Sequence, residues 1–409
     1  MNNKNKWSPI SEEVLINDRV RLISDALEKF ADYKSYSLLA GNSGIALFWY
    51  YYWSFTKKDK YFEKGNALIL KSFGFTNTNV KNSLCDGISG FMWVVNHLVS
   101  NNFIDGDCNE LFYEEEPYLG SSMMEDIKKG NYDYLHNALG LGLYFLSRNN
   151  KRSVNYIEAL IIELEKIAEK DINGLKWRST VIQKKNDTKE VYNLSLSHGI
   201  ASIISFLSKA YKQDILKVKT KELLGGAITF LLSLKSDVPN VHNGAYFPSF
   251  ISVNENEGDI GSRLAWCYGD LGIGIVLWQA AHILQNTEWE KMAIDILLHT
   301  TSRKDQIKEN VIDAGICHGS AGIAHIYNRM YQYTGILTFK ESAIYWLNVT
   351  LEKATFADGL AGYKAWYTPE YGGWKNATGL LEGIAGIGLV LLSATSNIEP
   401  KWDECLLLS

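Results

Sequence analysis

Two cysteines stand in matching positions of two similar segments, 262-SRLAWCYGDLGIG-274 and 315-GICHGSAGIA-324. Each lies two residues before a glycine that begins a Gly-x-x-Gly pattern, and Cys317 is followed directly by His318. Two thiolates and one imidazole suit tetrahedral zinc, and three protein ligands leave a fourth position for water or substrate. We predict that Cys267, Cys317 and His318 bind one zinc ion per chain. The alternative is a buried thiol beside a histidine that caps a helix.

A second histidine has the same place before its own glycine. This residue, His198, lies in 195-SLSHGIAS-202 without an adjacent cysteine. It is either a general acid/base that faces the metal or a histidine satisfied by hydrogen bonds at a helix start. Asp133 is placed to orient such a histidine or to cap a helix. Arg263, four residues before the first cysteine, either stabilises an anionic intermediate or pairs with a surface carboxylate.

A repeat accounts for these shared offsets. A glycine, two residues, a second small residue and an apolar run recur seven times, at intervals of 46 to 70 residues. The seven copies are 41-GNSG, 87-GISG, 137-NALG, 199-GIAS, 269-GDLG, 319-GSAG and 383-GIAG. Apolar runs such as 272-GIGIVLWQAAHIL-284 predict buried inner helices. Amphipathic segments between them, with Ile157, Leu160, Leu164 and Ile167 at helical spacing, predict outer helices that cover the inner ones.

Seven helical pairs form either an open solenoid or a closed ring. The first and last units resemble the middle ones, which favours closure because a solenoid needs polar caps. We therefore predict one all-α domain over residues 1–409 with short β or loop insertions. Expected insertions are 175-LKWRSTVIQ-183 with 190-EVYNLSL-196, 244-GAYFPSFI-251, and a solvated acidic loop at 105–120.

The position just before the first glycine of each unit is polar or ionisable in six of the seven copies. Its occupants are Ala40, Asp86, His136, His198, Tyr268, His318 and Glu382. In a closed ring of equivalent units, these side chains occupy equivalent places beside the buried helices.

Composition excludes several classes of partner. The net charge is -5 and no Lys/Arg-rich tract occurs, so we expect neither nucleic acid nor an anionic membrane surface as a partner. The polar N-terminus lacks the apolar core of a signal peptide, and the longest apolar run, 45-IALFWYYYW-53, is too short to span a bilayer. Five widely spaced cysteines fit a reducing compartment. We expect a cytoplasmic protein.

The chain resembles the lanthionine synthetase C family of lanthipeptide cyclases, most specifically in 266-WCYGDLG-272, 317-CHGSAG-322 and 197-SHGIAS-202. The resemblance implies an α/α toroid, a double-layered sevenfold helical barrel with zinc at the centre of one face. It also implies roles for residues that match the family's motifs. These are Cys267, Cys317 and His318 as zinc ligands, His198, Asp133 and Arg263 as catalytic residues, and Tyr268 and Trp266 as substrate contacts.

The implied reaction adds a peptide cysteine thiol to dehydroalanine or dehydrobutyrine and forms a lanthionine or methyllanthionine thioether. Zinc makes the thiol a thiolate without a strong base, and the enolate that follows needs a stabilising cation and a proton donor. Because no dehydratase-sized segment accompanies the cyclase, the chain resembles the stand-alone class I type. The expected partners are a dehydrated precursor of leader and core peptide, with a separate dehydratase and a transporter as candidates, and membrane association would come only through such a complex.

Three residues depart from the family pattern: Leu271 replaces a proline, Ser202 a second glycine and Asn137 a first glycine. Asparagine tolerates a left-handed backbone and serine is small, so we expect altered turns that keep the site intact.

Three other interpretations remain open. A zinc prenyltransferase β-subunit would need an Asp-Cys-His set, and a toroidal glycosidase would use Asp86 and Glu382 as paired carboxylates but would leave the matched cysteines unexplained. A non-catalytic zinc-, thiol- or peptide-binding relative within a modification complex is the alternative that keeps the same residues.

Overall fold

Every glycine turn predicted from the sequence is followed directly by a helix. The computed structural model describes residues 6–12, 14–29, 35–75, 81–148, 150–184, 187–254 and 261–409. Within these ranges the seven inner helices are nearly completely buried at their N-terminal ends. They are α2 (Asn42–Thr56), α4 (Ile88–Ser100), α7 (Ala138–Arg148), α9 (Ile200–Lys212), α11 (Asp270–Leu284), α13 (Ser320–Thr334) and α15 (Ile384–Thr395).

Seven outer helices accompany them in the described part of the chain. They are α1 (Val14–Lys29), α3 (Asp59–Phe75), α6 (Glu115–Lys128), α8 (Lys151–Ile167), α10 (Lys217–Ser233), α12 (Thr287–Thr300) and α14 (Leu337–Glu352). In α8, Ile157, Leu160 and Leu164 are buried while the charged residues face outward, as their spacing predicts. Short elements complete the helical set: α5 (Cys108–Leu111) and the 3-10 helices η1 (Pro369–Tyr371) and η2 (Lys401–Leu406).

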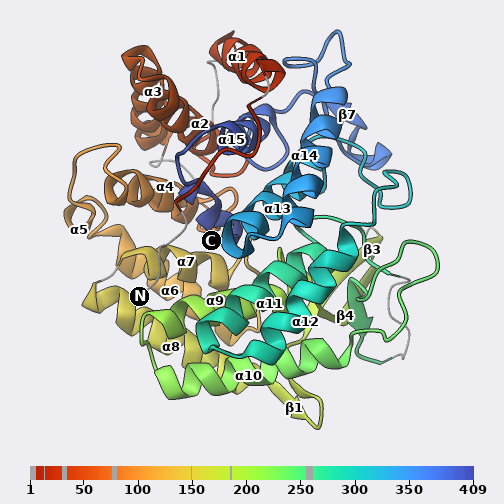
Figure 1. Ribbon diagram of the computed structural model, residues 1–409. Coiled ribbons are helices and arrows are strands. Elements are labelled where there is room, and N and C mark those ends of the chain that lie inside the picture. The colour runs from red at the N-terminus through yellow and green to blue at the C-terminus, as the bar shows by residue number, and fades with distance from the viewer. Residues whose placement is uncertain are drawn as a thin grey trace. The chain divides into compact units, whose positions relative to one another are not determined.

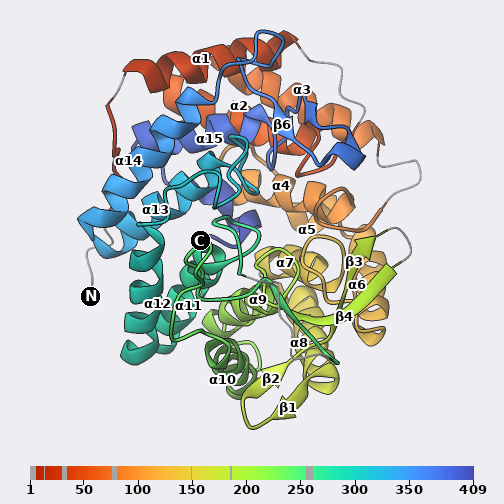
Figure 2. The same cartoon turned by 90° about the vertical axis from the view of Figure 1, so that its right-hand side faces the viewer.

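The chain divides into two compact units. The terminal unit comprises residues 1–81, 85–103 and 310–409, and the middle unit comprises residues 82–84 and 104–309. In the terminal unit α2 packs on α3, α13 on α14, and the last inner helix, α15, on the first outer helix, α1 (Figures 1 and 2). In the middle unit α7 packs on α8, α9 on α10 and α11 on α12. The single-domain organisation expected from the sequence stays a prediction.

Backbone hydrogen bonds join the sixth, seventh, first and second turns of the terminal unit and the fourth and fifth turns of the middle unit, through the residue two positions before the glycine. In the terminal unit Leu39 N donates to Cys85 O (3.1 Å), Leu381 N to Leu39 O (3.0 Å) and Cys317 N to Leu381 O (3.1 Å). In the middle unit Ser197 N donates to Cys267 O (3.3 Å). Residues two positions before the first glycine of their turns therefore occupy equivalent places in the structure.

Close backbone approach explains the second glycine in five of the seven turns. A Cβ added at Gly44, Gly322 or Gly386 would lie 2.1, 1.9 or 1.8 Å from the carbonyl oxygen six residues earlier. Ser202 occupies this position in the fourth turn, where its buried hydroxyl donates to Gly199 O at 2.6 Å. A serine thus satisfies its own polar group inside the turn.

The first position of the turn has a different requirement. Five of its glycines have φ between -101° and -132°, in the extended region that other residues adopt, and only Gly269 has a positive φ, +98°. Asn137 is not among the residues with positive φ. The expectation that asparagine stands there because it tolerates a left-handed backbone is therefore wrong, since this turn does not use that conformation.

The predicted insertions form small antiparallel sheets. A hairpin joins β1 (Glu169–Asp171) and β2 (Gly174–Lys176), and a three-stranded sheet has the order β3 (Ser179–Lys184), β4 (Asp187–Asn193), β5 (Phe250–Ser252). Ser179 pairs with Val191, and Tyr192 with Ile251. The hairpin β6 (Ala365–Trp366) and β7 (Trp374–Lys375), which the sequence did not suggest, precedes the seventh turn.

The expectation of an acidic loop at 105–120 is wrong for its second half. Residues 115–120 begin outer helix α6. Glu116 is buried there and accepts from Arg148 Nε at 2.7 Å, while its neighbours Glu114 and Glu115 are exposed. Consecutive glutamates suggest a solvated loop from composition alone. The sequence does not show that one of them is buried against an arginine of another helix.

A buried ionic network fastens the fifth turn of the middle unit. Asp270, at the start of α11, accepts from Tyr246 N (2.8 Å), Phe247 N (3.0 Å) and Arg303 Nη1 (3.0 Å). Arg303 also donates to Ser262 O (2.8 Å) and pairs with buried Glu309. One guanidinium therefore ties the insertion, the segment before the turn and the inner helix together.

Replacing Arg303 with alanine should lower the free energy of unfolding by about 3–5 kcal/mol, because it leaves two buried carboxylates without their cation. Chemical denaturation followed by circular dichroism measures the change. Arg21→Ala is the control, since its ion pairs are exposed and should contribute about 0–1 kcal/mol. Equal effects of the two substitutions would contradict the structural role of the Arg303 network.

Candidate active site and metal ligands

A histidine and an aspartate from consecutive turns form the core of the candidate site in the middle unit. His198, just before α9, and Asp133, just before α7, lie with Nδ1 and Oδ2 2.6 Å apart. The other oxygen of Asp133 accepts from Leu135 N (2.8 Å) and His136 N (2.9 Å). The carboxylate is thus fixed by the backbone of its own turn and in turn fixes the imidazole. Asp133 thus both caps its own turn and contacts His198, and its role in orienting the histidine stays a prediction.

The two groups shift each other's pKa. Burial alone lowers the pKa of His198, but the hydrogen bond and the charge of Asp133, together with the charge of Cys267, outweigh it and raise the pKa. Burial alone raises the pKa of Asp133, but the hydrogen bond and charge of His198 outweigh it and lower the pKa. His198 therefore stays protonated to a higher pH than a free histidine.

Two aromatic rings flank His198. The ring of His136 is nearly parallel to it, with centroids 5.8 Å apart and planes at 9°, and the ring of Tyr268 lies 6.2 Å away at 45°. Burial raises the pKa of the Tyr268 phenol, which therefore stays a hydrogen-bond donor. In the sequence, His136 stands out only as one of the polar residues just before the first position of a turn. That position was the one feature that could have indicated a role for it.

The fifth turn holds Cys267 rigidly. Its side chain is buried, and its carbonyl oxygen accepts from Leu196 N (3.0 Å) and Ser197 Oγ (3.3 Å). Arg263 is half-buried, and its carbonyl oxygen lies so close to Gly269 that a Cβ there would be only 2.1 Å away. Trp266 is completely buried, so in this conformation it offers no surface to a peptide, whereas Tyr268 is half-buried.

The sixth turn, in the terminal unit, carries Cys317 and His318 at the start of α13. His318 Nε2 lies 3.8 Å from Oδ2 of Asp313, a buried carboxylate that accepts from Gly315 N (3.0 Å) and Trp366 N (2.8 Å). Asp313 had no signal in the sequence, because its role comes from the fold of the turn and of the β6–β7 hairpin around it.

A further pair in the terminal unit joins the seventh turn to the same hairpin. The Tyr367 hydroxyl donates to Glu382, and burial followed by the charge of that carboxylate raises the pKa of Tyr367 well above its usual range. Glu382 is therefore engaged by a phenol, while Asp86 pairs with Lys81 at 2.5 Å. These separate partners do not support the glycosidase interpretation, which needs two carboxylates that act together.

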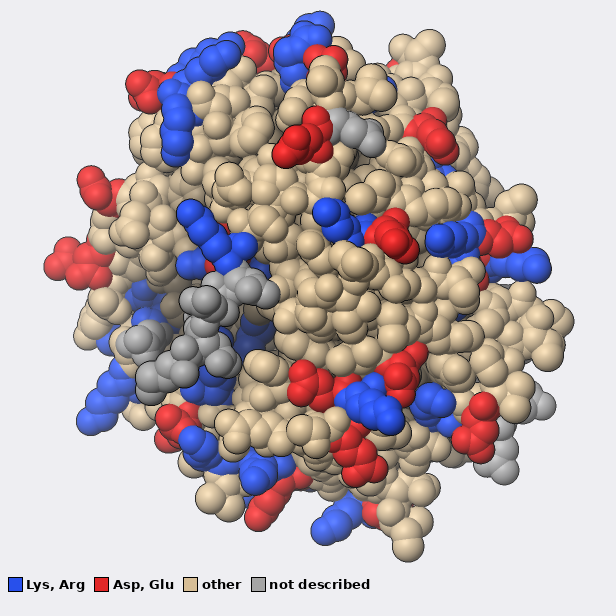
Figure 3. All heavy atoms as spheres, viewed as in Figure 1, with Lys and Arg blue, Asp and Glu red and all other residues tan. Residues whose placement is uncertain are grey.

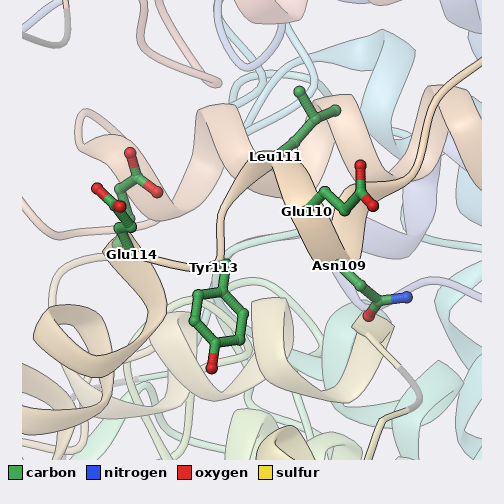
Figure 4. A pocket seen from close by; sticks show the side chains of 6 residues that line it. Asn109, Glu110, Leu111, Tyr113 and Glu114 are labelled. Atoms are coloured by element: carbon green, nitrogen blue, oxygen red, sulfur yellow. The ribbon is translucent and has the colours of Figure 1, made fainter.

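A pocket of about 410 Å³ lies elsewhere in the middle unit, at the acidic tract. It is lined by Asn109, Glu110, Leu111, Tyr113, Glu114 and Glu115, whose labelled side chains point in different directions (Figure 4). None of the residues predicted to do chemistry lines it. A cluster of exposed glutamates is common without a ligand, so the candidate site remains at the glycine turns.

Figure 3 shows one face of the molecule, on whose right-hand half lysines and arginines lie next to aspartates and glutamates. No helix in the described part of the chain is both long and apolar enough to cross a membrane.

The chain is similar over most of its length to proteins of one known family. The family described as "Lanthionine synthetase C-like protein" matches residues 32–407. The Nisin biosynthesis protein NisC of Lactococcus lactis subsp. lactis is 26% identical over 353 residues, which cover 80% of this chain and 77% of that protein.

The fold is similar to that of a solved structure, Nisin cyclase, with a TM-score of 0.74 at 20% identity over 96% of this chain and 97% of that one. This likeness confirms the expected fold class, an α/α toroid. Because the family match spans nearly the whole sequence, the chain belongs to the lanthionine synthetase C-like family.

Proposed function

We propose that the protein is a zinc-dependent lanthipeptide cyclase, which joins cysteine thiols of a dehydrated precursor peptide to dehydroalanine or dehydrobutyrine. The observation that carries the proposal is the His198–Asp133 pair, a proton donor of raised pKa in a chain of this family. The substrate is a peptide of leader and core segments that has already been dehydrated. A separate dehydratase and a transporter are the candidate partners, and any attachment to a membrane would come through them.

Cys267, Cys317 and His318 would hold the zinc. Neither cysteine is in a disulfide, both stand at the same position of their turns, and two thiolates with one imidazole are a zinc donor set with one open position. Support also comes from the repeat: several consecutive turns within each unit pair through this position, and the fifth and sixth turns are consecutive in sequence. Bound zinc would supply a substrate thiolate at neutral pH.

The chain's own residues would handle charge and protons. When the sulfur–carbon bond forms at the β-carbon, the electron pair of the double bond moves to give an enolate, and protonated His198 donates a proton to the α-carbon. Asp133 holds the imidazole in place and stabilises its cation. Arg263 is the proposed partner of the enolate oxygen, and Tyr268 is the proposed substrate contact beside His198. The proton lost by the substrate thiol restores the charge of His198 through solvent.

Purified wild type should contain about one zinc per chain, and Cys317→Ala should contain much less while its helical circular dichroism stays unchanged. The helices do not depend on the metal, because their cores are apolar. Cys85→Ala is the matched control, since Cys85 occupies the same position in the second turn and should keep its zinc. Loss of zinc in the control as well, or no zinc in wild type, would favour a non-catalytic relative.

His198→Asn should keep the zinc and slow cyclisation by roughly 10²–10⁴-fold, the usual contribution of a positioned acid or base. The rate of thioether formation, measured by mass spectrometry on a dehydrated peptide with free thiols capped, tests this. His282→Asn, at an exposed histidine of α11, is the control and should react at the wild-type rate. Near-normal thioether formation by His198→Asn would remove this residue from the mechanism.

Asp133→Asn should lower the pKa of His198, because burial then acts without the hydrogen bond and charge that oppose it. In wild type the stability gained from His198 is full below pH 6.5 and is lost as pH rises through its raised pKa. The stability gained from Asp133 is lost as pH falls through its own lowered pKa. NMR titration of the His198 ring measures the shift, with exposed Asp237→Asn as control. An unchanged midpoint would show that the pair does not form in solution.

A further inference from the structure

Asp133, His136 and His198 form a second group of potential metal ligands, apart from the cysteines. One ligand atom from each residue lies within 4.8 Å of those of the other two. All three residues belong to the middle unit and come from two consecutive turns. The group was not predicted as a metal site from the sequence, where only the offsets of the two histidines were visible.

The chemistry of the group suits a divalent transition metal. Imidazole nitrogen and carboxylate oxygen are both zinc ligands, and two histidines with one carboxylate form a common set that leaves positions for water. His198 Nδ1 and Asp133 Oδ2 lie 2.6 Å apart. Two ligands bound to one tetrahedral ion at about 2.0–2.1 Å are separated by about 3.3 Å, so a small opening of this pair admits the ion.

Accessibility separates this group from a similar pair that cannot bind an ion. His325 and Asp403 in the terminal unit also lie 2.7 Å apart, but both side chains are 0% exposed, and Arg329 donates to both oxygens of Asp403. The side chains of His198 and Asp133 are 28% and 25% exposed, and His136 is exposed beside them. An ion can therefore reach His198 and Asp133.

We propose that Asp133, His136 and His198 form a second, inhibitory site for a divalent metal such as zinc. The ion takes the place of the proton shared by His198 and Asp133: the Nδ1 lone pair binds the metal, and the displaced proton passes to the buffer. An imidazole whose Nδ1 binds the ion is no longer an imidazolium, so its remaining Nε2–H is too weak an acid to protonate the α-carbon, and occupancy of this site stops turnover. The inhibitory part rests on the proposed function, whereas the binding part does not.

Binding is tested without the cysteine site. The Cys267→Ala/Cys317→Ala double variant, titrated with cobalt(II) or zinc in a calorimeter, should still bind one ion per chain and release protons. Adding His136→Ala to the double variant should abolish that binding, whereas adding His282→Ala, at an exposed histidine of α11, should not. Absence of binding in the double variant, or binding that survives His136→Ala, would overturn the site, whatever reaction the protein catalyses.

Inhibition is tested on the full chain loaded with one zinc. Added zinc should slow cyclisation by wild type, and the half-inhibiting concentration should rise at least about tenfold in His136→Ala, each rate being taken relative to the same variant without added zinc. Equal sensitivity of the two proteins would overturn the inhibitory role. A chain that binds a second ion but forms no thioether without added zinc would instead refute the proposed cyclase function.

Discussion

Close contact between backbones at the glycine turns is the constraint on which the rest of the structure depends. Five of the seven inner helices begin where a carbonyl oxygen packs onto a glycine that has no side chain, and backbone hydrogen bonds join turns within each unit. Because backbone atoms hold the turns together, the fold does not require a particular side chain one or two positions before the glycine. Thiols, imidazoles and carboxylates can occupy those positions without disturbing the helices behind them.

Much of this architecture could be predicted from the sequence, because its signals are local. Glycine spacing and apolar runs located every inner helix, and helical periodicity located the outer helix α8, whereas the start of α6 was predicted as a loop. The link between Asp133 and His198 spans 65 positions, so no periodicity could reveal it. The place of each residue at its turn suggested the link, with helix capping as the alternative, before the family's motifs did. Asp313 and Tyr367 belong to no such motif. Their hydrogen bonds depend on the β6–β7 hairpin, whose strands are only two residues long. Sequence patterns therefore say least about long-range contacts that short irregular segments make.

Burial distinguishes the structural ionic groups of this protein from those that can react. Arg303 and Arg329 hold carboxylates that are closed to solvent, where a charge is tolerated only with its partner in place. The pair of His198 and Asp133 has similar chemistry but keeps a solvent-exposed edge. Its protonation can therefore change during a reaction, whereas a change at Asp403 would unbalance the packing of η2 against α13.

The packing of α15 on α1 sets an order for folding during synthesis. The middle unit is almost entirely one continuous stretch of chain, residues 104–309, and can assemble as soon as that stretch has left the ribosome. The terminal unit must wait, since its first outer helix has no partner until the last inner helix is made. Meanwhile Ile16, Val20 and Ile23 of α1 remain uncovered. The nascent chain therefore carries an exposed apolar stripe near its start until α15 has been made.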